Sequence, residues 1–198
     1  LDSDTIIKDD ISKLINKDMS SHTIAGAQDV SPESIVGLGV SLNRRYINAG
    51  VLLINLGRWR DQNVKKKCLE FIKTHNPNRN EQTALNAILH QIDSIDVVSL
   101  KYNFHPSWHH GEGNIELKSK LKIIHYWVPS ARPWHFENSE NEYTEIWLNY
   151  YKETPFTNFY PKYRYPKLLV WIQKHLEGIP VLSSIPKCLY KCLDCFAN

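Results

Sequence analysis

One apolar segment decides the fold of this chain: YINAGVLLIN, residues 46–55. Its run of aliphatic and β-branched side chains predicts a strand that is buried on both faces. Within it, Ala49 and Gly50 are small enough to let a ligand approach the backbone closely, and Asn48 offers an amide to hydroxyl groups. The alternative is a turn that leads into a core strand without binding anything.

The flanking sequence alternates between helical and extended patterns. Helical periodicity spans residues 57–74 and 80–92, and residues 9–15 form a capped helix start. Short apolar segments that predict further strands are residues 24–27, 96–100 and 122–126. Such alternation predicts an α/β domain with a mixed, mostly parallel sheet. Ligands bind at the carboxyl ends of strands in such sheets.

Composition excludes several classes of protein. The chain has 198 residues, 42% of them hydrophobic, and a net charge of +3, which is too small to indicate nucleic-acid binding. No apolar stretch approaches the roughly 18 residues of a membrane span. The four cysteines do not form a secreted disulfide framework, so we expect a reducing, cytoplasmic compartment. Cys188, Cys192 and Cys195 have the spacing of an iron–sulfur motif, but free thiols on a tail helix are the preferred interpretation.

The first candidate site is Asp2-Ser3-Asp4, two carboxylates separated by one residue. Hard cations such as Mn²⁺ or Mg²⁺ prefer these oxygens and usually share them with a substrate phosphate. The same spacing also occurs in solvated turns and helix N-caps. We expect the pair and His125 to lie at carboxyl ends of strands.

Two further segments carry polar side chains that suit a binding site. His125 ends the strand predicted at residues 122–126 and can ligate a metal through one ring nitrogen. Arg132 has the fork of donors that matches phosphate oxygens, and Trp134 could wall a pocket. Glu81 and Gln82 begin the helix predicted at residues 80–92, where Glu81 could equally be a plain N-terminal helix acid.

Taken in order, these motifs resemble glycosyltransferase family 8, over roughly Leu1 to Trp134. Residues 144–156 also resemble the C-terminal region of bacterial members. The resemblance implies a retaining, metal-dependent enzyme with a single Rossmann-like domain of the GT-A type. It further implies that residues 1–142 form the C-terminal portion of that domain and residues 143–198 a helical, aromatic and basic extension.

The resemblance also implies roles for individual residues. Asp2, Asp4 and His125 would ligate Mn²⁺ or Mg²⁺ on the diphosphate of a UDP-sugar. The side chains expected at the nucleotide and phosphates are Asp2, Ser3, Asp4, His125, Arg132 and Trp134. Those expected at the sugar are Asp29, Asn48, Ala49, Gly50, Glu81 and Gln82. Gln82 and Glu81 would be catalytic, with Gln82 beneath the anomeric carbon.

Three departures from the family pattern concern these residues. Glu81 stands where many members have Asp, and Arg132 stands where members usually have Lys. One additional residue separates His125 from Pro133, so the phosphate loop is expected to differ locally.

The expected reaction is transfer of galactose or glucose from a UDP-sugar to a glycan or lipid-linked acceptor, as in lipopolysaccharide and other bacterial surface glycans. The family's nucleotide-binding part precedes the Asp pair, so we expect it to lie outside this sequence and the isolated chain to bind UDP weakly. Two alternatives are a non-catalytic sugar- or metal-binding fragment and a metal-dependent phosphohydrolase. The basic, aromatic segment 160–198 either contacts the inner face of the plasma membrane or packs on the domain.

Overall fold

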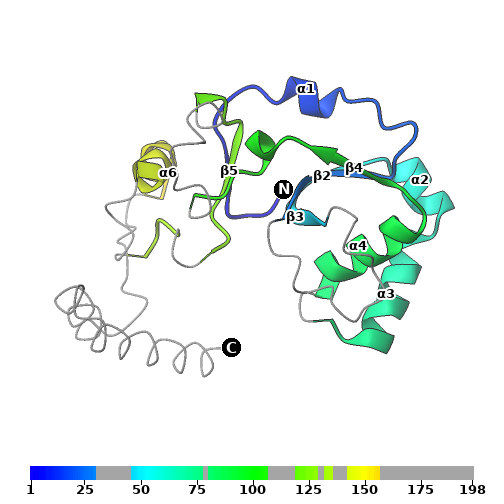
Figure 1. Ribbon diagram of the computed structural model, residues 1–198. Helices are drawn as coiled ribbons and strands as arrows, with labels where there is room; N and C mark the ends of the chain where they lie inside the picture. The colour runs from blue at the N-terminus through cyan, green and yellow to red at the C-terminus, as the bar shows by residue number, and fades with distance from the viewer. Residues whose placement is uncertain (30–45, 78–79, 107–118, 129–131, 136–141, 157–198) are drawn as a thin grey trace, which may run out of the picture. The chain divides into compact units, whose positions relative to one another are not determined.

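The computed structural model describes residues 1–29, 46–77, 80–106, 119–128, 132–135 and 142–156 (Figure 1). It divides into two compact units, Leu1–Tyr126 and Trp127–Asn198. The predicted tail and its three cysteines lie outside the described residues.

A three-stranded sheet forms the centre of the first unit. Its order is β3 (Ile47–Ile54), β2 (Ile24–Gln28) and β4 (Ile95–Val98). Strand β2 runs antiparallel to β3 and parallel to β4. The α/β class and the mixed sheet are therefore as predicted. Among the described strands, however, antiparallel pairing is more frequent than the mostly parallel prediction implies. Strand β4 follows helices along the chain, as the crossover to a parallel neighbour requires.

Helices α3 (Val64–His75) and α4 (Asn80–Gln91) pack against each other and bury the apolar face of this sheet (Figure 1). The core that results contains Ile24, Ile47, Val64, Cys68, Phe71, Ala84, Ala87, Ile88 and Leu89. On α3 the buried side chains recur at the three- and four-residue spacing of one helix face. This layer fixes the position of β3 and of the first turns of α4.

The single helix predicted over residues 57–74 is two helices. Helix α2 (Leu56–Asp61) begins at Asn55, whose side chain accepts a hydrogen bond from the Arg58 backbone N–H. The chain then turns at Asn63, whose φ of 51° lies in the left-handed region. Asparagine tolerates this conformation better than most residues, and it ends α2 before α3 begins. The apolar periodicity continues across the break, so the pattern alone did not reveal it.

A second, two-stranded sheet lies beside the chain terminus at Leu1. Strand β1 (Thr5–Ile7) pairs antiparallel with β5 (Ile123–His125), and Thr5 lies opposite His125. An ion pair between Asp9 and Lys122 extends the pairing, and this hydrogen bond lowers the pKa of Asp9 and raises that of Lys122.

Two short helices complete the described part of the first unit. Helix α1 (Ser12–Ile15) begins three residues later than the predicted helix start at residue 9. The 3-10 helix η2 (Leu100–Tyr102) contributes Tyr102 to a small core with Leu14, Val51 and Ile123.

The second unit contains helix α6 (Glu142–Lys152) among its described residues. The Trp147 ring stacks on that of Tyr151 with centroids 5.3 Å apart, and the Trp134 ring centroid lies 6.1 Å from that of Trp147. Within the described part of the chain, no helix has the length and apolar character needed to cross a bilayer.

Candidate active site

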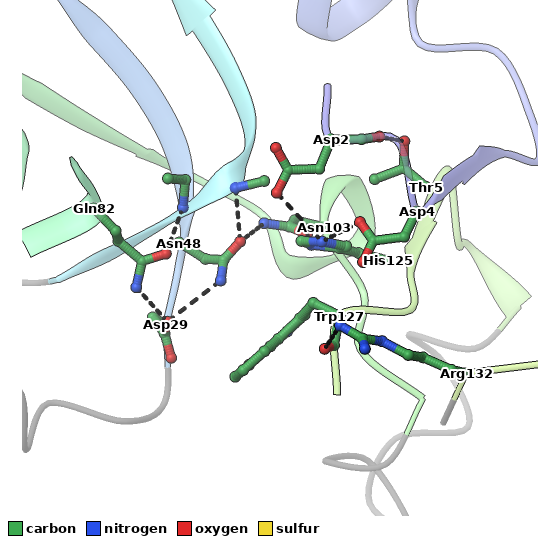
Figure 2. A network of polar contacts seen from close by, with 12 residues as sticks. Asp2, Asp4, Thr5, Asp29, Asn48, Gln82, Asn103, His125, Trp127 and Arg132 are labelled. Atoms are coloured by element: carbon green, nitrogen blue, oxygen red, sulfur yellow. Dashed lines mark hydrogen bonds and ion pairs between the residues drawn. The ribbon is translucent and has the colours of Figure 1, made fainter. Parts of the chain in front are cut away.

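Asp2, Asp4 and His125 come together in the first unit (Figure 2). One ligand atom from each lies within 4.8 Å of the other two. The His125 Nε2 atom is 3.1 Å from Asp4 Oδ1 and 3.7 Å from Asp2 Oδ2. His125 is buried, whereas the side chain of Asp2 is 59% exposed and that of Asp4 is 22% exposed. The cluster therefore presents a fixed imidazole and two carboxylates that solvent or a ligand can reach.

Backbone pairing brings the cluster together. The antiparallel register of β1 and β5 puts the amino end of β1 beside the carboxyl end of β5. The Tyr126 N–H donates to the Asp4 carbonyl (2.9 Å), and the Asp2 N–H donates to the Gly50 carbonyl (2.8 Å). His125 ends a strand as predicted. Strand β1 begins directly after Asp4, and the expectation that the Asp pair lies at the carboxyl end of a strand stays a prediction.

This donor set fits a hard divalent cation. Carboxylate oxygens suit Mn²⁺ and Mg²⁺, and an imidazole nitrogen is compatible with Mn²⁺. Three protein ligands leave further coordination positions for phosphate oxygens or water.

A second polar cluster contains Asp29, Asn48 and Gln82 (Figure 2). All three are buried, at 2%, 8% and 8% exposure. Asp29 Oδ2 accepts hydrogen bonds from Gln82 Nε2 (2.9 Å) and Asn48 Nδ2 (3.3 Å). Gln82 Oε1 accepts from the Ala49 N–H (2.9 Å), which ties α4 to β3. Side chains from two other elements thus share a single buried carboxylate.

Gly50 also has a packing role that the sequence did not predict. A methyl group on its α-carbon would lie 2.0 Å from Cε1 of His125 and 2.4 Å from Nδ1. The absent side chain therefore makes room for the His125 ring.

Three residues to which the sequence assigned no role support the site. Asn86 donates to the Ile47 carbonyl and accepts from its N–H, both at 2.8 Å, and so docks α4 on β3 as a neighbouring strand would. The Tyr46 hydroxyl contacts Gln82 Nε2 at 3.3 Å. Asn103 contacts both Asn48 and His125 and joins the two clusters. Their partners are distant in sequence, so no local pattern indicated these contacts.

Of the remaining predicted residues, two belong to the first unit and two to the second. Glu81 is an exposed acid in the first turn of α4, and Ser3 is exposed between the two aspartates. Arg132 and Trp134 belong to the second unit. There Arg132 Nη2 donates to the Trp127 carbonyl (3.1 Å), and its guanidinium lies 5.8 Å from the centre of the Trp134 ring.

Comparison with known proteins gives a consistent family assignment. Residues 1–138 match the sequence model described as glycosyl transferase family 8. The chain is 28% identical over 177 residues to general stress protein A of Bacillus subtilis (strain 168), an alignment that covers 78% of this chain and 58% of that protein. It therefore spans little more than half the length of that relative.

Solved structures of glycosyltransferases share the fold. The crystal structure of glycosyltransferase GlyE from Streptococcus pneumoniae TIGR4 is 28% identical, with a TM-score of 0.57 over 76% of this chain and 37% of that one. The structure of galactosyltransferase LgtC in complex with donor and acceptor sugar analogs is 21% identical, with a TM-score of 0.60 over 74% of this chain and 57% of that one. These similarities confirm the GT-A type of fold.

Proposed function

Because the chain belongs to glycosyltransferase family 8, we propose that it carries the metal and sugar sites of a retaining transferase that uses a UDP-hexose. The observation that carries this proposal is the convergence of Asp2, Asp4 and His125 within 4.8 Å, next to the buried Asp29 cluster. We propose galactose or glucose as the transferred sugar and a glycan or lipid-linked sugar as its acceptor.

The two clusters support separate roles, one in metal binding and one in sugar binding. Asp2, Asp4 and His125 Nε2 would hold Mn²⁺ or Mg²⁺. When bound, this ion would neutralise charge that develops on the departing diphosphate. Asp29 and Asn48 have the acceptor and donor groups to bind sugar hydroxyls. The proposed arrangement thus separates the groups that bind the leaving diphosphate from those that bind the sugar.

Gln82 is proposed to lie beneath the anomeric carbon. An amide is a poor nucleophile, and both ends of this one already make hydrogen bonds, to Ala49 and to Asp29. We therefore propose attack by the acceptor on the same face that the diphosphate leaves, with Gln82 stabilising the positive charge of the sugar ring. Asp29, which holds Gln82, supplies a negative charge for the same purpose.

The other predicted residues extend the proposal. Ser3, Arg132 and Trp134 are assigned to the nucleotide and its phosphates, Ala49 and Gly50 to the sugar through their backbone, and Glu81 to the catalytic region. The proposed location is the cytoplasm at the inner face of the plasma membrane, with segment 160–198 as a peripheral membrane contact.

UDP release tests the proposal. The full-length protein is incubated with UDP-galactose or UDP-glucose in Mn²⁺, and UDP is measured with wild type, Asp4→Asn and Asp61→Asn. Asp61 is an exposed acid at the end of α2 and controls for loss of one negative charge. We expect Asp4→Asn to lower the rate at least about 100-fold and Asp61→Asn to leave it unchanged. Equal rates in wild type and Asp4→Asn would contradict a catalytic site here and support the non-catalytic alternative.

A further inference from the structure

Asn103 joins the two clusters of the candidate site through its side-chain amide. It caps the C-terminal end of η2, where its backbone N–H donates to the Leu100 carbonyl, and only 7% of its surface is exposed. Its Nδ2 lies 2.8 Å from Asn48 Oδ1, and its Oδ1 lies 2.9 Å from His125 Nδ1 (Figure 2).

The directions of these hydrogen bonds follow from one backbone group. The Gly50 N–H can only donate, and it donates to Asn48 Oδ1 (2.9 Å), so this oxygen is an acceptor. Asn103 must therefore present its NH₂ group to Asn48 and its carbonyl oxygen to His125. Because a carbonyl oxygen only accepts, His125 must carry a proton on Nδ1.

The consequence for His125 concerns its second nitrogen. In a neutral imidazole with the proton on Nδ1, the lone pair is on Nε2. That atom faces the carboxylates of Asp4 and Asp2. A residue that accepts a hydrogen bond from the other ring nitrogen of a ligating histidine fixes its tautomer and ring orientation in this way.

A series of hydrogen bonds with a common direction leads from His125 to Asp29. His125 donates to Asn103, Asn103 to Asn48, and Asn48 to Asp29. All of the donors point toward the Asp29 carboxylate, so each hydrogen bond polarises the next. The amide at position 103 thereby connects the imidazole to the proposed sugar-binding residues.

We propose that Asn103 is a positioning residue that orients the His125 imidazole for metal ligation and the Asn48 amide for the donor sugar. This inference rests on the metal site of the proposed function. It assigns a defined role to each end of one amide, whereas a merely structural asparagine would serve only to satisfy buried polar groups.

Substitutions at position 103 separate these roles. Asn103→Ala removes both the acceptor for His125 and the donor for Asn48. Asn103→Asp keeps an acceptor for His125 but cannot donate to Asn48. Asn103→Leu, whose side chain branches at the same carbon, removes both groups without a cavity and is used if the alanine variant does not fold. Asn55→Ala is the matched control, because Asn55 also makes two hydrogen bonds with its amide, at the start of α2.

The experiment measures Mn²⁺ binding to the full-length protein by electron paramagnetic resonance, without substrate. Pulsed measurements report the ¹⁴N coupling of a directly ligated imidazole. We expect Asn103→Ala or Asn103→Leu to weaken Mn²⁺ binding by about 10–100-fold and to lose the coupling. We expect Asn103→Asp to bind within a few-fold of wild type and to retain the coupling, and Asn55→Ala to match wild type.

A separate measurement tests the sugar side of the proposal. Asn103→Asp should raise KM for the UDP-sugar while Mn²⁺ affinity is retained. Wild-type Mn²⁺ affinity in Asn103→Ala, or equal loss in Asn103→Asp and Asn103→Ala, would overturn the inference and leave the proposed function intact. Absence of Mn²⁺ binding in wild type would instead overturn the metal site itself, and the inference with it.

Discussion

The backbone of Gly50 lies directly against the imidazole of His125, and a methyl group on the Gly50 α-carbon would lie 2.0 Å from Cε1 of that ring. Real carbon contacts are far longer, so one of the two groups would have to move. The ring has little freedom to do so, because Nδ1 is hydrogen-bonded to Asn103 and the residue is buried. The smallest residue on β3 thus sets the position of the proposed metal ligand on β5.

Gly50→Ala is predicted to displace the His125 ring. Overpacking of this kind costs about 1–3 kcal/mol, and a displaced ligand should weaken Mn²⁺ binding at least about tenfold. Chemical denaturation and an Mn²⁺ titration measure the two effects. Gly57→Ala is the control, since its new methyl group would meet Asn55 Oδ1 at 3.3 Å, on α2. Unchanged Mn²⁺ affinity in Gly50→Ala would contradict the role of His125 as a ligand.

The three residues of the proposed metal cluster could be predicted because each is marked by local pattern. Asp2 and Asp4 are two residues apart, and His125 ends an apolar strand. What the pattern could not provide is the pairing that brings them together. Strand β1 has only three residues, too few for an alternating signal, so the sequence did not predict it.

Asn103 could not be predicted for a different reason. Its two partners are 55 and 22 residues away, and the surrounding Leu100–Phe104 segment carries no motif. Such contacts depend on how η2 packs in the finished fold. The fold class, by contrast, follows from apolar runs and helical periodicity that each segment carries by itself.

A buried hydrogen bond between Gln82 and Asp29 can be tested by reversing its direction. In the wild type, Gln82 Nε2 lies 2.9 Å from Asp29 Oδ2. Gln82→Glu removes this donor and leaves two carboxyl groups side by side. We expect the substitution to lower stability by about 1–3 kcal/mol. Asp29→Asn in the same protein restores a donor–acceptor pair, with the new amide at position 29 as the donor, and should recover most of the loss.

Urea denaturation of wild type, both single variants and the double variant measures this coupling. A favourable coupling energy of about 0.5–3 kcal/mol is expected for groups in direct contact. Purely additive effects would mean that the two side chains do not interact in the folded protein. Transfer activity should remain low in the double variant, because the negative charge has moved from residue 29 to residue 82.

Asn63 interrupts the helical pattern at a left-handed φ of 51°. Asn63→Ala should lower the free energy of unfolding by about 1 kcal/mol, because alanine adopts the left-handed region less readily than asparagine. Asn63→Gly should be neutral or slightly stabilising, because glycine adopts it freely. Thermal denaturation of the two variants distinguishes them. An alanine variant that is more stable than the glycine variant would indicate that residue 63 continues a regular helix, where alanine is favoured by about 1 kcal/mol.

Cys68 lies in the core on the buried face of α3, and burial raises the pKa of its thiol to about 11 from an ordinary 9.0. The folded state therefore holds this proton more tightly than the unfolded state. Its contribution to stability is fully present below pH 9 and is lost as the pH rises through about 11. Stability should consequently fall across this window in part because of Cys68.

The variant Cys68→Ala isolates that contribution, because lysines and tyrosines titrate over the same range in both proteins. At pH 7 the variant should be less stable by about 1–2 kcal/mol, since a small cavity replaces the sulfur. Between about pH 9 and pH 11 the difference from wild type should shrink, as wild type loses the stability that its neutral thiol provides. A constant difference in urea-denaturation free energy from neutral pH to about pH 11 would show that burial does not shift the Cys68 thiol.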